Sequence, residues 1–186
     1  MIFPAMKRLL WLAALALPCA GFAADYAVQP AASKLGFSGS FQGASFDGSF
    51  GRWTAAISYD PANLAASKFD VTVELASAKT GDSDRDGALP GADFFDVAKY
   101  PEAHFVSTGF RREGGKVIAD GQLTLRGVTK PVSLAVEFRP QGGGATLDVA
   151  TTLKRLDFGV GGGEYADTSV IGADVKVSAH LALTAK

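Results

Sequence analysis

This chain of 186 residues has one cysteine, Cys19, so it cannot form a disulfide within itself. Cys19 follows a short apolar run near the N-terminus, where a lipoprotein signal also places its cysteine. Pro18 precedes it, however, at a position where a lipoprotein signal has a small residue. We therefore expect Cys19 to leave with a signal peptide rather than to be lipidated. The exported domain must then be held together by burial of apolar side chains.

The first residues of the chain have the pattern of an export signal. Lys7 and Arg8 precede an apolar run over residues 9–17, and small residues follow at Gly21 and Ala23. This order is typical of a secretory signal peptide, and the run is too short to span a bilayer. We predict a signal peptide over residues 1–23 and one exported domain over residues 24–186. We expect a periplasmic location, with full secretion left open.

Neither positive nor negative charge is in large excess, and side chains that commonly act in catalysis are few. The formal net charge is −1 and no basic run occurs, which argues against nucleic acid as the main partner. His104 and His180 are the only imidazoles, too few for a zinc site with its three or four ligands. No pattern pairs either histidine with a nucleophilic serine. A non-enzymatic protein is therefore favoured, and acid–base catalysis by Arg85 with nearby aspartates stays open as an alternative.

Apolar residues, in contrast, are abundant and recur at every second position. This period is typical of strands with one inward and one outward face. Glycine groups separate the segments, and Arg126-Gly127 predicts a tight hairpin between two of them. About eight strands suit an all-β fold, an antiparallel barrel or a curled sandwich. We expect strands near residues 25–29, 33–42, 44–59, 67–77, 103–112, 116–125, 130–139, 145–158 and 170–184.

One segment, TGDSDRDGALPGADFFDVAKYP at residues 80–101, interrupts this rhythm. It is too long for a hairpin loop, so we expect a functional or capping excursion with a helical turn at residues 92–97. Its aspartates begin with the D-x-D-x-D spacing of a calcium loop, but Asp93 stands where the twelfth-position glutamate belongs. Arg85 also supplies positive charge among the acids. We therefore expect no metal here, and we expect Arg85 and Asp86 to clamp the segment in place.

Phenylalanine is the most frequent aromatic residue, with 13 copies. Phe37, Phe41, Phe46 and Phe50 recur through the first strands, with Trp53 and Ile57 after them. One interpretation is that these side chains simply fill the core. The other is that they line an apolar pocket for a hydrocarbon chain, in which each buried methylene contributes about 0.8 kcal/mol. The residues alone leave both interpretations open.

Three sequence blocks resemble the YceI-like family of secreted lipid-binding barrels. The first is the segment of residues 80–101, with its T-x-x-x-x-R-D and D-F-F-D-V-A-K-Y-P elements. The second is GQLTLRGVTKPV at residues 121–132. The third is RLDFGV at residues 155–160, followed by Ile-Gly at residues 171–172. The three blocks occur in the family's order and span nearly the whole exported domain.

The resemblance implies a single antiparallel eight-stranded lipocalin-like β-barrel with one short helical excursion near residues 82–100. It implies an interior pocket for a long-chain isoprenoid or other amphiphilic lipid, with no catalytic residues, no metal and no cofactor other than such a ligand. We expect the excursion to cover the barrel and to turn its apolar residues inward. The pocket is then lined by Phe37, Phe41, Phe50, Trp53, Ile57, Leu89, Phe94, Phe95, Phe105, Leu123, Leu125 and Phe158.

The chain departs from the family in its first long strand. Many members carry two histidines there, and this chain has Ala32 and Phe41 in their places. A head-group contact through those histidines is therefore in doubt here. Divergent members can accompany membrane b-type cytochromes, so presentation of an isoprenoid quinone to such a cytochrome is an alternative to simple lipid carriage, resting on analogy. A homodimer through edge strands is also left open.

Overall fold

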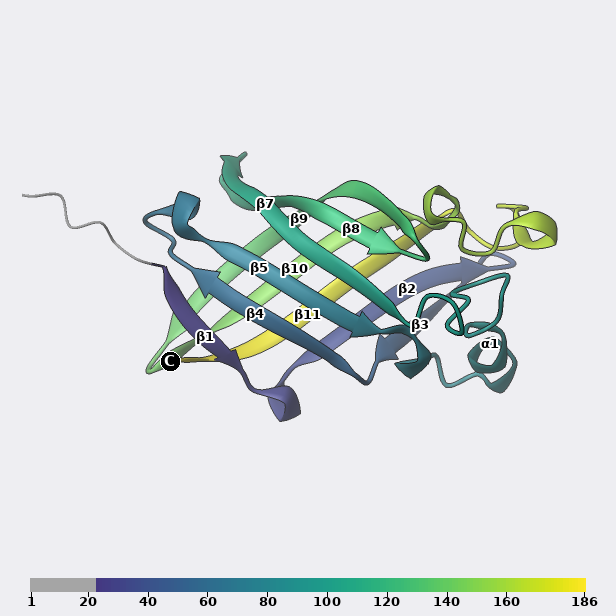
Figure 1. Cartoon of the computed structure of the whole chain (residues 1–186), viewed down its shortest axis with the longest axis horizontal. Coiled ribbons are helices and arrows are strands. Elements are labelled where there is room, and N and C mark those ends of the chain that lie inside the picture. Colours follow the sequence, from purple (N-terminus) through teal and green to yellow (C-terminus); the bar gives the residue numbers. More distant parts are fainter. Residues whose placement is uncertain (1–22) are drawn as a thin grey trace, which may run out of the picture.

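Strand follows strand through residues 23–186, the part of the chain that this computed structural model describes (Figure 1). The predicted signal peptide lies outside the described residues except for Ala23, so it stays a prediction. No helix among the described residues is long and apolar enough to cross a membrane. The strands are β1 (Ala24–Val28), β2 (Lys34–Phe41), β3 (Ala44–Phe50), β4 (Trp53–Tyr59), β5 (Lys68–Glu74), β6 (Ala78–Lys79), β7 (Glu102–Glu113), β8 (Lys116–Leu125), β9 (Val128–Gln141), β10 (Gly144–Lys154) and β11 (Asp174–Ala185).

Eight of these strands close into an antiparallel barrel, as the sequence predicted. Their order is β1-β4-β5-β7-β8-β9-β10-β11, and pairing of β1 with β11 completes the ring. The hairpin of β2 and β3 extends the wall at one end, because β11 pairs with β2 as well as with β1. The predicted hairpin at Arg126-Gly127 is confirmed. Both residues have positive φ, 50° and 74°, as a two-residue turn between twisted strands requires.

The strand expected over residues 44–59 is two strands, β3 and β4, with a break at Gly51-Arg52. The break forms because the backbone turns to Ser77. Gly51 donates its N–H to the Ser77 carbonyl, and the Arg52 N–H donates to the Ser77 hydroxyl at 3.0 Å. As a result β3 pairs with β2 and β6, whereas β4 pairs with β1 and β5.

The helical part of the excursion also differs from expectation. The helix is α1 (Ser83–Ala88), and residues 92–97 form turns instead. Asp82 caps α1, since its carboxylate accepts the N–H groups of Asp84 and Arg85. Pro90 cannot donate to continue the helix, and Asp96 has φ 50°, which no α-helix allows. The expected turn at residues 92–97 was therefore wrong in position, although residues 23–186 do contain a single short α-helix.

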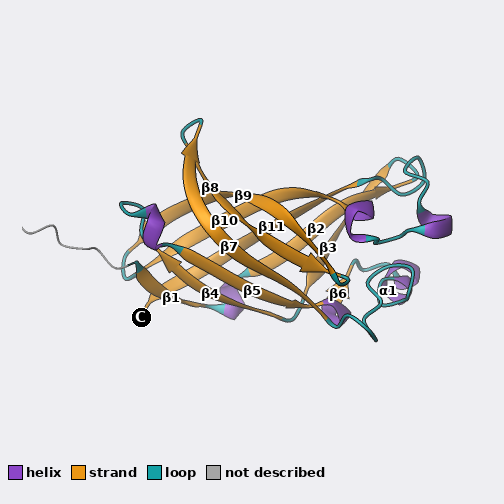
Figure 2. Cartoon of the chain, turned by 45° about the horizontal axis from the view of Figure 1, so that its top comes forward, coloured by secondary structure: helices purple, strands orange, loops and turns teal. Residues whose placement is uncertain are grey.

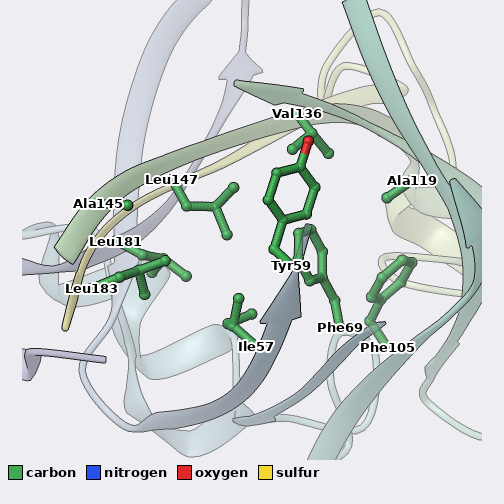
Figure 3. Close-up of a cluster of buried hydrophobic side chains, with 10 residues drawn as sticks. All are labelled: Ile57, Tyr59, Phe69, Phe105, Ala119, Val136, Ala145, Leu147, Leu181 and Leu183. Atoms are coloured by element: carbon green, nitrogen blue, oxygen red, sulfur yellow. The ribbon is translucent and has the colours of Figure 1, made fainter. Parts of the chain in front are cut away.

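Aromatic side chains close the barrel at the end opposite α1. Tyr59 lies among Phe69, Phe110 and Phe138, with ring centroids 6.1, 6.1 and 4.7 Å away, and Tyr26 lies against Phe138. Figure 3 shows Tyr59 and Phe69 side by side above Ile57, facing Leu147 across the interior. We call this the plugged end. The chain's C-terminus lies there (Figure 1).

Two loop segments gather at the other end, which we call the cap end. The first cap segment, residues 80–101, carries α1. The second, residues 155–173, carries the 3-10 turns Arg155–Phe158 and Gly163–Tyr165. Figure 2 shows these helical turns together beyond the strand ends. A second buried cluster, which includes Phe37, Phe95 and Phe158, lies beneath them.

Candidate ligand cavity

The half of the barrel between the plug and the cap segments encloses a cavity of about 240 Å³. Phe69 of the plug lies at its inner limit, and residues of both cap segments line its other limit. The structure brings almost all of the predicted pocket residues to this one cavity. Those that line it are Phe37, Phe50, Trp53, Ile57, Leu89, Phe94, Phe95, Phe105, Leu123, Leu125 and Phe158.

Phe41 is the exception, because the structure places it outside the cavity with 40% of its surface exposed. Its side chain has the same strand parity as Phe37, so it belongs to the inward face of β2. However, Phe41 is the last residue of that strand, three residues beyond Ser38, where the pairing of β2 with β11 ends. Alternation therefore identified its face but not its depth along the barrel.

The predicted set of pocket residues left out Phe46 and most of the aliphatic residues of the wall. Phe46 on β3 lines the cavity, as do many aliphatic residues with inward parity. The signal for these was present in the alternation of every strand. Examples are Leu35, Val73, Val132, Leu153 and Val177.

Two glycines make room for aromatic rings in the wall. Gly48 lies directly across from Phe37, and a Cβ at Gly48 would be 2.3 Å from that ring. Gly121 lies beneath Phe105 in the same manner, at 2.4 Å. Without a side chain at these inward positions, each ring lies across its neighbouring strand rather than projecting further into the interior. Both glycines therefore widen the cavity.

The first cap segment is held by its charged residues. Asp86 accepts hydrogen bonds from the Thr80 N–H at 2.6 Å and from the Thr80 hydroxyl at 2.8 Å. The Thr80 backbone N–H in particular holds the pKa of the Asp86 carboxyl below its usual value. The Arg85 guanidinium lies 4.6 Å from the centre of the Phe46 ring and 3.5 Å from the Asp82 carboxylate. Asp86 thus fastens the segment to its own start, and Arg85 rests it on the barrel wall.

The second cap segment is organised around a buried arginine. Arg155 is 5% exposed, and burial lowers the pKa of its guanidinium. The guanidinium donates to five backbone carbonyls, and no carboxylate among the described residues forms an ion pair with it. A guanidinium has five N–H groups, so this set uses all of its donors. The accepting residues are Val160, Gly161, Tyr165, Ile171 and Gly172.

The two cap segments are joined to each other and to the barrel. Gly161 donates its N–H to the Asp93 carbonyl at 2.7 Å, and the Phe94 and Tyr165 rings lie 5.1 Å apart. Arg126, in the β8–β9 hairpin, donates to the carbonyls of both segments, at Ala92 and Gly159. Because the other end is plugged, an elongated ligand would reach the cavity through this joined cap.

The cavity wall offers shape and apolarity rather than reactive groups. Arg155 is the one charged residue of the described part of the chain that lines it, and its five N–H groups all donate to carbonyls. Both histidines lie on the outer surface, where His104 contacts Asp70 and His180 contacts Asp148. Within residues 23–186, no three metal-ligating side chains come together. Such a wall suits the hydrocarbon part of an amphiphile.

Comparison with known proteins places this barrel among relatives that it matches over most of their length. A model of the YceI-like domain matches residues 26–183. A "UPF0312 protein" of Pseudomonas syringae pv. syringae is 40% identical over 81% of this chain and 87% of its own length. One of Vibrio parahaemolyticus is 38% identical over 83% and 88%.

Solved structures share the fold. BcnA of Burkholderia cenocepacia has a TM-score of 0.80 and 32% identity, and the match covers 84% of this chain and 99% of that one. The YCEI protein of Campylobacter jejuni has a TM-score of 0.66 and 27% identity, with 75% and 84% covered. A polyisoprenoid-binding domain of Saccharophagus degradans has a TM-score of 0.66, 18% identity and coverage of 88% and 99%; this likeness is one of fold.

Proposed function

The chain belongs to the YceI-like family, and from this membership and its apolar cavity we propose that it carries a long-chain isoprenoid or related amphiphilic lipid inside the barrel. The proposal includes a periplasmic location and no catalytic role. A polyisoprenoid-binding domain with the same fold supports the ligand class.

The observation that carries this proposal is the apolar wall of the cavity. A lipid tail in the cavity would leave water for a surface of leucine, valine and phenylalanine side chains, at about 0.8 kcal/mol for each methylene. An isoprene unit of five carbons would thus contribute up to about 4 kcal/mol before ordering costs. Because all five N–H groups of the Arg155 guanidinium already donate to backbone carbonyls, Arg155 offers no hydrogen bond to a lipid head group. Affinity in this cavity would therefore follow chain length more than head group.

The test is lipid analysis of protein purified from its own periplasm. Native mass spectrometry followed by organic extraction should find one isoprenoid lipid per chain. Phe95→Asp, which places a carboxylate in the buried wall beside Phe50, should lose the lipid. Gln122→Glu adds the same charge on the outer face and should keep it.

Two results would count against carriage. A lipid-free protein that also takes up no added isoprenoid would mean that the phenylalanines are only core. Equal lipid content in Phe95→Asp and wild type would place the ligand elsewhere. Recovery of a redox-active quinone would instead favour the alternative, presentation of that quinone to a membrane b-type cytochrome.

A further inference from the structure

Exposed large apolar side chains occur at one end of the described barrel only. Each is between 36% and 40% exposed, and each belongs to a cap segment or to a hairpin beside one. None of them lines the cavity. They are Phe41, Val128, Leu156, Tyr165 and Val170.

Backbone contacts bring these side chains together around the cap. Phe41 forms a bridge with Ile171, and the Gln42 N–H donates to the Val170 carbonyl at 2.7 Å. Tyr165 belongs to the same segment, and its ring packs at a tilt against Phe94 of the other cap segment. On the other side, the β8–β9 hairpin brings Val128 toward the turn that holds Leu156, because Lys130 pairs with Asp157 and Arg126 bonds Gly159. We call these five residues the cap-end apolar surface.

This surface lies where a ligand must pass. The plugged end is packed with aromatic rings, whereas the cavity extends to the cap segments. A lipid tail that left through water would expose every methylene as it emerged, which costs free energy in proportion to its length. A tail that moved directly into another apolar phase would avoid that exposure. The cap-end apolar surface is placed to make such a contact.

The charges around this surface indicate which kind of lipid head group it would contact. The first cap segment has five aspartates against Arg85 and Lys99, and the second has three acidic residues against the buried Arg155. Asp84, Asp93 and Glu164 are exposed, and none has an ion pair among the described residues. This acidic rim would be repelled by anionic head groups and attracted by ammonium groups.

We propose that the cap end docks on a bilayer of zwitterionic phospholipid, with the cap-end apolar surface in the interface and the acidic rim facing lipid ammonium groups. Lipid passes between this bilayer and the cavity through the joined cap segments. The docking mode rests on the proposed carrier function, since it gives the carried lipid its route. Apolar tips on separate turns suit shallow insertion into a soft interface better than a flat protein contact.

Flotation of the exported domain with vesicles tests the docking. Binding should be measurable on phosphatidylcholine–phosphatidylethanolamine vesicles and should fall when phosphatidylglycerol replaces half of the lipid. The double variant Phe41→Asp with Val170→Asp should bind about tenfold more weakly. Its control is Ala62→Asp with Ala65→Asp, which adds the same charge at the plugged end and should bind as wild type. Leu156→Asp, on a different element, should also weaken binding.

Each outcome decides the proposal. Unchanged binding in both cap-end variants, stronger binding to phosphatidylglycerol vesicles, or no binding to any vesicle by a lipid-loaded protein would overturn it. So would a dimer in sedimentation that only the cap-end variants abolish, because the surface would then face a second copy. Native mass spectrometry of the same samples separates the two ideas. Loaded protein that does not dock refutes docking alone, and docking without any lipid uptake refutes carriage and the transfer route.

Discussion

Substituting alanine for glycine at three positions should have three different effects on stability, because the same added methyl group meets three different surroundings. At Gly48 the new Cβ would lie 2.3 Å from the Phe37 ring, which is the movable end of a side chain. At Gly121 it would lie 2.4 Å from the Phe105 ring and also 2.6 Å from the Val106 carbonyl oxygen, which is fixed by the sheet. At Gly87, in α1, nothing lies within 4 Å.

The magnitudes follow from what has to move. Gly48→Ala should lower the free energy of unfolding by about 1–3 kcal/mol, since Phe37 must turn into the cavity and partly leave Phe50. Gly121→Ala should lower it by about 3 kcal/mol or more, because backbone as well as ring must shift. Gly87→Ala should raise it by about 0.5–1 kcal/mol, because alanine loses less conformational freedom in a helix.

Urea unfolding of the three variants measures this series, and lipid content provides a second readout. Gly48→Ala should also carry less lipid, because the displaced Phe37 ring occupies cavity volume. Gly87→Ala should carry as much as wild type. If Gly121→Ala were no less stable than Gly48→Ala, or if neither changed stability, the packing of rings over bare backbone would not be as described.

Three further predictions concern the cap segments. Asp86→Asn should lower the free energy of unfolding at neutral pH and make that free energy fall less steeply in acid. The Asp86 carboxyl has a lowered pKa in the folded state, so it stabilises the fold above its unfolded pKa of about 3.9 and loses that contribution as the pH falls. Urea unfolding measured at several pH values would show the difference. Arg155→Met should destabilise by about 3 kcal/mol or more, because five carbonyls lose their donor, and Arg155→Lys should recover only part of this in thermal unfolding. Arg126→Met should speed lipid release and amide hydrogen exchange in residues 80–101, because Arg126 bonds both cap segments. Amide exchange in β9 and β10 should stay as in wild type. Unchanged lipid release would show that Arg126 does not hold the cap closed.

The strands could be predicted from the residues because their information is local, whereas their closure into a barrel rather than a curled sandwich was implied by the family resemblance. Strict alternation marks each strand and its inward face, and Arg126-Gly127 has the turn chemistry of a hairpin. Alternation does not show how far along the barrel axis a residue lies. Phe41 was therefore expected in the pocket, although it stands at the end of its strand and is exposed. Alternation also does not distinguish one long strand from two, as the break at Gly51 depends on a contact with the distant Ser77.

The structure of the cap segments was harder to predict, because contacts between residues distant in sequence determine it. Asp82 and Pro90 are local signals for the ends of α1, yet the expected turn was placed at residues 92–97, where apolar residues cluster. The positive φ of Asp96 and the hydrogen bond from Gly161 to Asp93 are features of the assembled cap. Likewise, no pattern in the sequence showed that Arg155 would be buried among carbonyls rather than paired with an acid.

The aromatic plug has a consequence for which ligands fit. A tunnel open at both ends would let a chain of any length thread through, but this cavity ends at Phe69, against which Tyr59 packs. A carried lipid would therefore enter tail first and leave by retracing its path, with its polar end toward the caps. The plug would also limit how far a tail can enter the cavity. If the protein carries such a lipid, a tail shorter than the cavity would leave wall uncovered and a longer one would project beyond the caps. The position of the two rings would then set the preferred tail length.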